Sequence, residues 1–480
     1  MNDNIWSWDA AKIREKIRIR RISVRDAVES NLKRLKEVNP NINAVVDILD
    51  EDALCTADKL DNSVLESHDV GPLHGVPITV KINIDYAGRP TTNGVVAFKD
   101  IIAPEDSITV ESFRKAGAVI IGRTNVPAFS TRFFTDNALH GQTLNPWDPK
   151  KTPGGSSGGA AAAVATGIGV LAHGNDRAGS VRYPAFACGV YGFRPTLGRI
   201  PNYNPSTRTE RGLFSQLTTV QGALARSIND LRLALNVLTI NDIRDPWSVR
   251  SPKDEIKTTT NKSVALFSKN KSSGVHPTIF DGLRVAASWL EDAGYKVEEQ
   301  EPPHIEEAAA LFWSLMLTEE LHIADKTSSS SSSGIKELGD PAVIKARNST
   351  MANSKILNHE EFIQGFSRRT TIIRDWLQFL DSHPIILAPV SWQPPFPKDF
   401  DQKGDEALGR LLKAHEPMTA VSLLGLPALS VPIGTKNGLP YGIQIIGDRF
   451  QEELLFSVGE TIQNRSPVKT PIDPVKLNKS

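Results

Sequence analysis

Two polar side chains in this sequence are of the types that can attack a carbonyl group, Ser180 as nucleophile and Lys81 as base, and a third candidate, Ser156, stands between them in the sequence. A serine hydroxyl is a poor nucleophile and needs a base within hydrogen-bonding distance. Lys81 lies within an apolar run, residues 76–84, where loss of water would lower the pKa of its ammonium group. A neutral lysine accepts protons at physiological pH, so Lys81 is a candidate base. From an edge strand the same side chain would reach solvent instead, and the run alone leaves that alternative open.

Ser156 stands in a glycine-rich turn, residues 152–159 (TPGGSSGG), ahead of an alanine run that predicts a helix. The free N–H groups of a helix start could hold a phosphate. However, phosphate-binding loops of nucleotide-binding proteins end in Gly-Lys-Ser/Thr, and here Gly158-Gly159-Ala160 follows. This ending argues against a nucleotide site. A tight turn that packs the helix against a sheet is the structural alternative.

Ser180 ends a second run of mostly small residues, 174–180 (GNDRAGS). Such a run can expose the hydroxyl while successive backbone N–H groups converge on one point, as an oxyanion hole requires. His173 and Asp176 could complete a Ser-His-Asp arrangement, but no G-x-S-x-G segment frames Ser180. We therefore expect His173 to end a strand and to bond to backbone groups.

The elements that position these residues alternate between short apolar strands and helices. Ser23 followed by Asp26 predicts a capped helix that ends at Asn39-Pro40. Further strands and helices are predicted where apolar residues alternate or recur at helical spacing: strands over 43–49, 76–84, 118–121, 264–268, 384–389, 427–434 and 441–447, and helices over 107–115, 279–290 and 452–462. The serine run 328–333 predicts a flexible connector. The alternation predicts an α/β fold.

Composition narrows the classes of function. The 480 residues contain 55 Lys and Arg against 55 Asp and Glu, so the formal net charge is zero. A protein without excess positive charge lacks the signature of a nucleic-acid binder and suits a small neutral partner. Two cysteines, Cys55 and Cys188, cannot form a disulfide framework, which predicts a reducing compartment. Because no secretory signal and no membrane span is visible, we predict a soluble cytoplasmic protein with no nucleic-acid or membrane partner.

The segments that contain Lys81, Ser156 and Ser180, in this order along the chain, resemble those of the amidase signature family of serine hydrolases. The resemblance extends over nearly the whole chain and rests on the segments around the three candidate residues together with RTNVPAFS (123–130), NPWDP (145–149), GALARSIND (222–230) and GLPALSVPIGTKNGLPYGIQIIG (425–447). It implies a single α/β/α sandwich domain, residues 1–480, with a large mixed β-sheet. Within it we expect a signature core at about 60–230, a substrate-pocket region at about 300–420 and an extended tail at 466–480.

The resemblance also implies a Ser-cisSer-Lys triad. Ser180 matches the nucleophile, Ser156 the bridging serine in a cis peptide unit, and Lys81 the general base. The remaining expected site residues are the oxyanion-hole N–H groups of Arg177, Ala178, Gly179 and Ser180, and the supporting residues Gly154, Gly155, Ser157, Asp176 and Arg182, of which the last two form an ion pair. No metal and no cofactor is implied. The predicted function is therefore metal-free hydrolysis of a small carboxylic acid amide through an acyl-enzyme, with ester cleavage as a potential side activity.

Three positions depart from the family pattern. Arg177 and Ala178 replace the usual Thr and Gly, and Ile82 replaces the Asp that commonly follows the lysine. If position 178 needs a positive φ, alanine is strained there. Two alternatives stay open: a glutaminase subunit of a tRNA-dependent amidotransferase, whose usual GSDTGGSIRQP is not matched, and a non-catalytic binding protein on an amidase fold. The substrate and the oligomeric state, for which a homodimer is one option, are left open.

Aromatic residues are frequent in the predicted pocket region. An apolar or aryl acyl group could be clamped by them, and ordinary core packing is an equal alternative for each one. The set consists of Phe312, Trp313, Trp376, Phe379, Trp392 and Phe396. Cys188, just past Ser180, is expected to be a buried neighbour of the site without a catalytic role.

Overall fold

One eleven-stranded mixed sheet runs through the molecule in the computed structural model, which describes residues 4–66, 71–207, 209–249, 261–269, 274–323 and 332–476. The strands lie in the order β1-β3-β2-β4-β6-β5-β10-β11-β9-β7-β8. Their bounds are β1 Val45–Ile48, β2 Pro77–Lys81, β3 Val119–Thr124, β4 Leu171–Asp176, β5 Tyr191–Arg194, β6 Val220–Ala225, β7 Ser263–Leu266, β8 Lys296–Glu299, β9 Ile385–Ala388, β10 Ala428–Lys436 and β11 Leu439–Gly447. The four strands β3, β2, β4 and β6 carry or flank the candidate residues.

Parallel and antiparallel pairs both occur in the sheet. β2 is parallel to both β3 and β4, and β7 is parallel to both β8 and β9. All other neighbouring pairs among the described strands are antiparallel. Because β2 and β4 run in parallel, Lys81 and the loop after Asp176 leave the sheet at the same edge.

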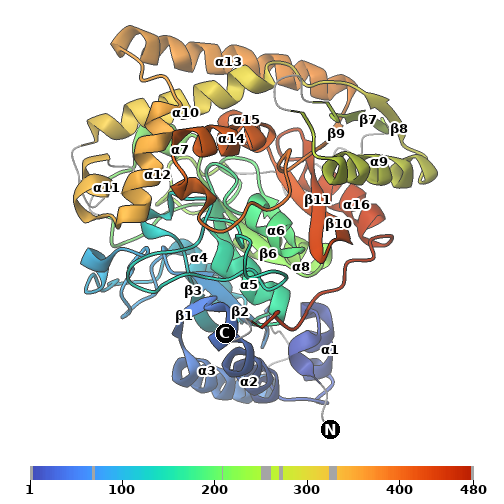
Figure 1. The fold of residues 1–480 in the computed structure, drawn as a ribbon. Coiled ribbons are helices and arrows are strands. Elements are labelled where there is room, and N and C mark those ends of the chain that lie inside the picture. Colours follow the sequence, from blue (N-terminus) through green and yellow to red (C-terminus); the bar gives the residue numbers. More distant parts are fainter. Residues whose placement is uncertain are drawn as a thin grey trace.

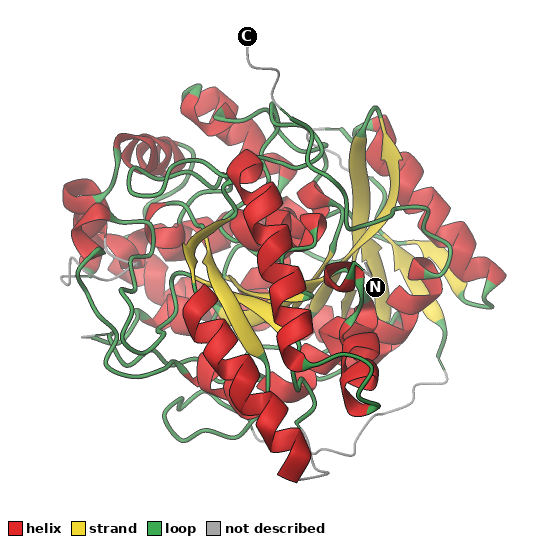
Figure 2. Ribbon diagram, turned by 90° about the horizontal axis from the view of Figure 1, so that it is seen from below, coloured by secondary structure: helices red, strands yellow, loops and turns green. Residues whose placement is uncertain are grey.

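Helices cover both faces of the sheet (Figures 1 and 2). Their bounds are α1 Ala10–Arg18, α2 Val24–Ile42, α3 Asp50–Glu66, α4 Ile108–Lys115, α5 Gly158–Thr166, α6 Arg182–Cys188, α7 Leu213–Gln216, α8 Ile228–Leu238, α9 Pro277–Asp292, α10 Ile305–His322, α11 Ser332–Leu338, α12 Pro341–Ala352, α13 His359–Ser382, α14 Asp405–Ala414, α15 Glu416–Leu424 and α16 Glu452–Gln463. Figure 1 shows α10, α12, α13, α14 and α15 gathered on the side opposite α1, α2 and α3.

Alternate residues of a central strand point into different cores. In β9, Ile385 and Leu387 pack with α9 and α16, whereas Ile386 and Ala388 pack with α10, α13 and α15. A strand buried on both faces needs apolar residues at every position, which explains the uninterrupted run PIILAP. The architecture is thus α/β with one mixed sheet between helical layers, as predicted.

The predicted elements are present with shifted ends, and α2 is longer than predicted. The prediction that this helix ends at Asn39-Pro40 is wrong, since it continues to Ile42. Pro40 removes one backbone donor close to the end of the helix. The loss is tolerated because Asn43, in a left-handed conformation, donates its N–H to the Asn39 carbonyl at 2.7 Å and closes the last turn.

The predicted serine connector and the predicted extended tail are described only in part. Residues 328–331 of the predicted serine connector lie outside the described residues, and α11 begins at Ser332. Residues 466–476 form neither helix nor strand, and the N–H of Ile472 donates to Ala165 at the far end of α5. No helix in the described ranges combines the length and apolar character needed to cross a membrane.

Candidate active site

Lys81 is the last residue of β2 and is fully buried. Its Nζ lies 2.8 Å from Ser156 Oγ and 2.7 Å from Asn175 Oδ1. Burial lowers the pKa of Lys81 to about 7, and the negative charge of Asp176 opposes that shift. The alternative in which Lys81 reaches solvent is therefore wrong. The side chain has the environment of a base that is partly neutral at physiological pH.

Ser156 lies in the turn that leads into α5, and the peptide bond between Gly155 and Ser156 is cis. The turn packs against other backbone: a methyl group on Gly154 would overlap Pro184, and one on Gly155 would overlap the backbone at Arg132. Gly154 also has a φ of 83°. Glycines are required here by close approach and conformation, which holds the Ser156 hydroxyl toward Lys81.

Ser180 stands at the start of the turn into α6 and is partly exposed to the cavities described below. Its carbonyl oxygen accepts a hydrogen bond from the N–H of Ser157 at 3.2 Å. Ser156 and Ser180 line the same cavity. The structure thus brings the three predicted catalytic residues together from segments 75 and 24 positions apart in the sequence.

Asp176 organises the loop before Ser180. Its buried carboxylate is 3.1 Å from guanidinium nitrogens of both Arg182 and Arg194, and Arg182 contacts both carboxylate oxygens. Burial alone would raise the pKa of Asp176, but these two guanidiniums reverse that effect and hold the pKa well below its usual range. The predicted Asp176–Arg182 ion pair is present, and Arg194 is a partner that the sequence analysis missed.

The same carboxylate fixes the backbone of the loop. Asp176 Oδ1 accepts a hydrogen bond from the N–H of Gly179 at 2.9 Å, and Oδ2 accepts one from Val181 at 3.2 Å. The N–H of Gly179 is therefore engaged within the loop. The other three predicted oxyanion donors are the backbone N–H groups of Arg177, Ala178 and Ser180.

The departure at position 178 causes no backbone strain. The positive φ of this loop, 109°, falls on Gly179, and Ala178 is not among the residues with positive φ. A methyl group on Gly179 would overlap the Met418 side chain. Glycine is therefore required at 179, whereas 178 accepts alanine.

His173 takes no part in a Ser-His-Asp arrangement. Its Nε2 lies 2.7 Å from Gln221 Oε1, and its Nδ1 faces the backbone N–H of Lys81 at 3.4 Å. Burial lowers the pKa of His173 to about 3, so the ring is neutral near pH 7. The expectation that His173 bonds to the backbone is confirmed, but the expectation that it ends a strand is wrong, since it lies inside β4. Cys188 is also buried, and burial raises the pKa of its thiol.

A chain of amides next to Lys81 was not anticipated. Asn175 Nδ2 donates to Asn83 Oδ1 at 3.2 Å, and Asn83 Nδ2 donates to Ser130 Oγ at 3.1 Å. Ser130 in turn donates to Asn93 Oδ1 at 2.7 Å. This directional chain turns the oxygen of Asn175 toward Lys81. The sequence did offer a signal for this chain: Asn83 stands two positions after Lys81, and Asn175 directly precedes Asp176.

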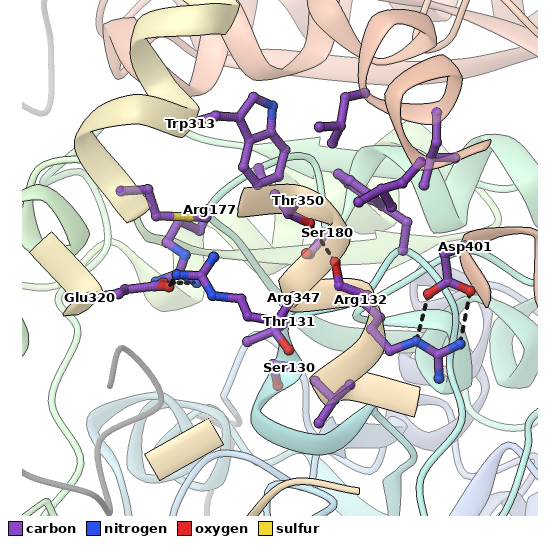
Figure 3. Close-up of a pocket in the computed structure, with 18 residues that line it drawn as sticks. Ser130, Thr131, Arg132, Arg177, Ser180, Trp313, Glu320, Arg347, Thr350 and Asp401 are labelled. Carbon is purple, nitrogen blue, oxygen red and sulfur yellow. Dashed lines mark hydrogen bonds and ion pairs between the residues drawn. The ribbon is translucent and has the colours of Figure 1, made fainter. Parts of the chain in front are cut away.

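Two cavities meet at Ser180. The first, which we call the apolar cavity, has an apolar wall formed by Phe133, Ala178, Trp313, Met316, Leu408, Leu411 and Leu412, and five charged side chains also line it: Arg132, Arg177, Glu320, Arg347 and Asp401 (Figure 3). The second, the polar cavity, is lined by Ser156 and by amide and hydroxyl side chains that include Asn83, Asn93, Asn175, Asn202, Asn204 and Thr207. Such a pair of chemically different cavities can hold the two halves of one substrate.

Residues from α10, α12 and α14 supply much of the apolar cavity. Of the predicted aromatic set, Trp313 lines it, while Phe312, Trp376 and Trp392 are buried in a hydrophobic core. Periodicity could not separate these two roles because both place aromatic residues on an inward face. Within the described residues, no group of three or more His, Cys, Asp or Glu side chains could hold a metal ion.

Comparison with known proteins points to one family. The family model described as "Amidase" matches residues 26–456. An indoleacetamide hydrolase of Bradyrhizobium diazoefficiens is 41% identical over 97% of this chain and 87% of its own length. A subunit of the glutamyl-tRNA(Gln) amidotransferase of Carboxydothermus hydrogenoformans is 30% identical over 95% of this chain and 97% of its own.

Among solved structures, a bacterial aryl acylamidase of the amidase signature family superimposes with a TM-score of 0.81. The two chains are 27% identical, and the match covers 96% of this chain and 97% of the other. The sequence motifs, the mixed sheet and the family model lead to one assignment. The chain belongs to the amidase signature family of hydrolases, which act on carbon–nitrogen bonds other than peptide bonds.

Proposed function

We propose that this protein hydrolyses an arylacetamide through an acyl-enzyme on Ser180. The observation that carries the proposal is the buried Lys81 Nζ, 2.8 Å from Ser156 Oγ, at a cavity that Ser180 also lines. A lysine with a pKa near 7 is partly neutral at physiological pH and can take a proton from a serine hydroxyl. Because Asn175 Oδ1 can only accept, it holds an N–H of Lys81 and leaves the lone pair for Ser156.

The reaction then follows from these positions. Lys81 accepts the proton of Ser156, and Ser156 accepts the proton of Ser180 as Ser180 Oγ bonds to the amide carbon. The protons return along the same path to the leaving nitrogen as the C–N bond breaks. Water then attacks the ester on Ser180 with the same relay and releases the acid. The three side chains carry protons from Ser180 to the leaving nitrogen and later from the attacking water back to Ser180, so these steps use only residues of this chain, the substrate and water.

Negative charge develops on the carbonyl oxygen during attack. We assign its stabilisation to the backbone N–H groups of Arg177, Ala178 and Ser180, since that of Gly179 is held by Asp176. The Asp176 carboxylate with Arg182 and Arg194 keeps this loop fixed before substrate binds. Fixed donors stabilise the charge without reorganising during the reaction.

The chemistry of the apolar cavity suggests the acyl group. Trp313, Phe133 and Met316 offer aromatic and polarisable surface that suits a flat aromatic ring. The relative from Bradyrhizobium is named for indoleacetamide, in which the aromatic ring belongs to the acyl group. That name supports an aryl group on the acyl side. Glutamine is the second candidate substrate because amidotransferase subunits are also relatives.

Ammonia release separates these candidates. The purified protein is incubated with indole-3-acetamide, phenylacetamide, an aliphatic amide and glutamine, with the Ser180→Ala variant as the blank. Faster turnover of the arylacetamides supports the proposal, and faster turnover of glutamine would favour the glutaminase alternative. If the protein hydrolyses none of these amides and a fluorophosphonate does not label Ser180, the result would support the alternative of a non-catalytic binding protein. The single-domain organisation, the cytoplasmic location and a homodimer remain predictions from the sequence.

A further inference from the structure

Arg177 occupies the junction between the two cavities. The residues that line both cavities are Ser130, Arg177 and Ser180. Two of these have one-carbon side chains, so Arg177 is the bulky member. Its side chain is 18% exposed and lies beside the nucleophile, where most of the family has threonine according to the resemblance above. The width of the passage between the cavities therefore depends mainly on where the Arg177 side chain lies.

A buried ion pair holds that side chain in place. Arg177 Nη2 is 3.3 Å from Glu320 Oε1 on α10, and Glu320 also pairs with Arg347 on α12. Figure 3 shows these three side chains together on one side of the apolar cavity, apart from the Arg132–Asp401 pair. The Glu320 side chain is only 2% exposed, and a buried carboxylate is stable only with partners of opposite charge. The guanidinium of Arg177 is thus fixed against α10.

The proposed mechanism gives each cavity a role. The leaving nitrogen receives its proton from Ser156, and Ser156 lines the polar cavity but not the apolar cavity. The amine part of the substrate therefore lies in the polar cavity, and the acyl group extends into the apolar one. The carbon atom next to the carbonyl must then pass the junction beside Arg177.

We propose that Arg177, anchored by Glu320, is a specificity-determining residue that admits acyl groups with an unbranched carbon next to the carbonyl, as in arylacetyl groups. This inference rests on the proposed function. A methylene group passes the junction, whereas a methyl branch on that carbon meets the Arg177 side chain. One extra methyl group against a pocket wall changes specificity by roughly 10–200-fold.

The test compares phenylacetamide with 2-phenylpropanamide, which differ by that methyl branch. The measured quantity is the ratio of their kcat/KM values in the wild-type protein and in three variants. Arg177→Ala shortens the side chain and should lower the ratio by about 10-fold or more. Arg177→Lys keeps a long, positively charged side chain that can still pair with Glu320, and it should leave the ratio within about 3-fold by the same steric argument. Glu320→Gln removes the anchor and should lower the ratio without any change in residues 177–180.

The variants at 177 are suited to the test because Glu320 and Arg347 still balance each other when Arg177 is replaced. Thermal unfolding followed by circular dichroism checks that each variant is folded. Equal losses of kcat/KM for both substrates in Arg177→Ala would overturn the proposal, since the residue would then act only through the loop backbone. An unchanged ratio in Glu320→Gln would overturn the anchoring. If wild-type protein hydrolyses neither amide, the proposed function itself fails, which is a different result from an altered ratio.

Discussion

The amino group of Lys81 lies 2.8 Å from the hydroxyl of Ser156, and both side chains are almost completely shielded from solvent. Shielding is what lowers the pKa of Lys81 to about 7. Ile82, in place of the usual Asp of the family, is also buried and adds no charge beside the lysine. The pair therefore combines a short proton path with a base whose charge changes near physiological pH.

The first prediction concerns the pH dependence of activity. Since only neutral Lys81 accepts the proton, kcat/KM for an amide should rise as pH increases through about 7 and then level off. Lys81→Arg keeps a positive charge at all accessible pH values and should lose activity throughout, as should Lys81→Met. Measuring kcat/KM from about pH 5 to about pH 9 checks this. Because the pKa of His173 is about 3, a midpoint near 7 would not come from that histidine.

The second prediction concerns stability. In the unfolded chain, the pKa of a lysine is about 10.4, so between about 7 and about 10.4 the unfolded state binds a proton at Lys81 that the folded state lacks. The contribution of this group to the free energy of unfolding therefore rises with pH in that window, by up to about 1.4 kcal/mol per pH unit, and it is lost as pH falls from about 10.4 to about 7, below which it no longer changes. Lys81→Met should remove this slope. Urea unfolding of both proteins at several pH values measures the difference, and equal slopes would contradict it.

The adjacent serines 156 and 157 give the third prediction. Ser156→Ala removes the relay between Lys81 and Ser180 and should lower kcat about 10²–10⁴-fold. The buried Ser157 hydroxyl has no hydrogen-bond partner among the described residues, and its role in the site comes from its backbone N–H. Ser157→Ala loses no hydrogen bond, so its kcat should stay within about 3-fold of wild type and its unfolding free energy should not fall. A loss in Ser157→Ala as large as that in Ser156→Ala would refute the assignment of the relay to Ser156.

The fourth prediction compares two single substitutions in the loop before Ser180, Gly179→Ala and Ala178→Gly. Gly179→Ala places a side chain at a φ of 109° and against Met418, so activity should fall at least about 100-fold through distortion of the oxyanion loop. Ala178→Gly should change kcat/KM by less than about 3-fold, because Ala178 has an ordinary negative φ. Steady-state kinetics on one arylacetamide compares the two. Equal effects would mean that the positive φ does not decide which residue the loop accepts.

Much of the site could be predicted from the sequence because its residues stand in glycine-rich turns and at the end of an apolar strand. The spacing of glycines around Ser156 and Ser180 reports backbone requirements that few other residues meet. Arg194 was missed because it lies on β5, beyond the loop that it supports, and its pairing with Asp176 depends on the order of strands in the sheet. Glu320 and Arg347 were missed for the same reason, since helices far along the chain bring them to Arg177.

Helix and strand ends were less predictable than the elements themselves. Pro40 predicts the end of a helix because it has no backbone N–H to donate. The helix α2 nevertheless continues to Ile42, since Asn43 closes the last turn. For the aromatic residues of α10, core and cavity are both inward positions. Phe312 and Trp313 are neighbours in sequence and differ only in which side of the helix meets the cavity. That distinction depends on tertiary packing, which single-chain periodicity does not contain.

The fifth prediction tests the Asp176 carboxylate, which lies between Arg182 and Arg194 with all three side chains fully buried. Asp176→Asn leaves two buried guanidiniums without a counter-charge and should lower the unfolding free energy by about 3–5 kcal/mol. In the folded fraction, removal of the negative charge near Lys81 should lower the pKa of that lysine further, so the acid limb of the activity profile should move to lower pH. The matched control is Asp58→Asn, which breaks an exposed pair with Arg25 (2.7 Å) and should cost far less stability than Asp176→Asn. Denaturant unfolding and the pH profile of kcat/KM are measured on both variants. A shift of the acid limb to higher pH in Asp176→Asn, or equal stability losses in the two variants, would show that the buried carboxylate does not act on the lysine and the loop as argued.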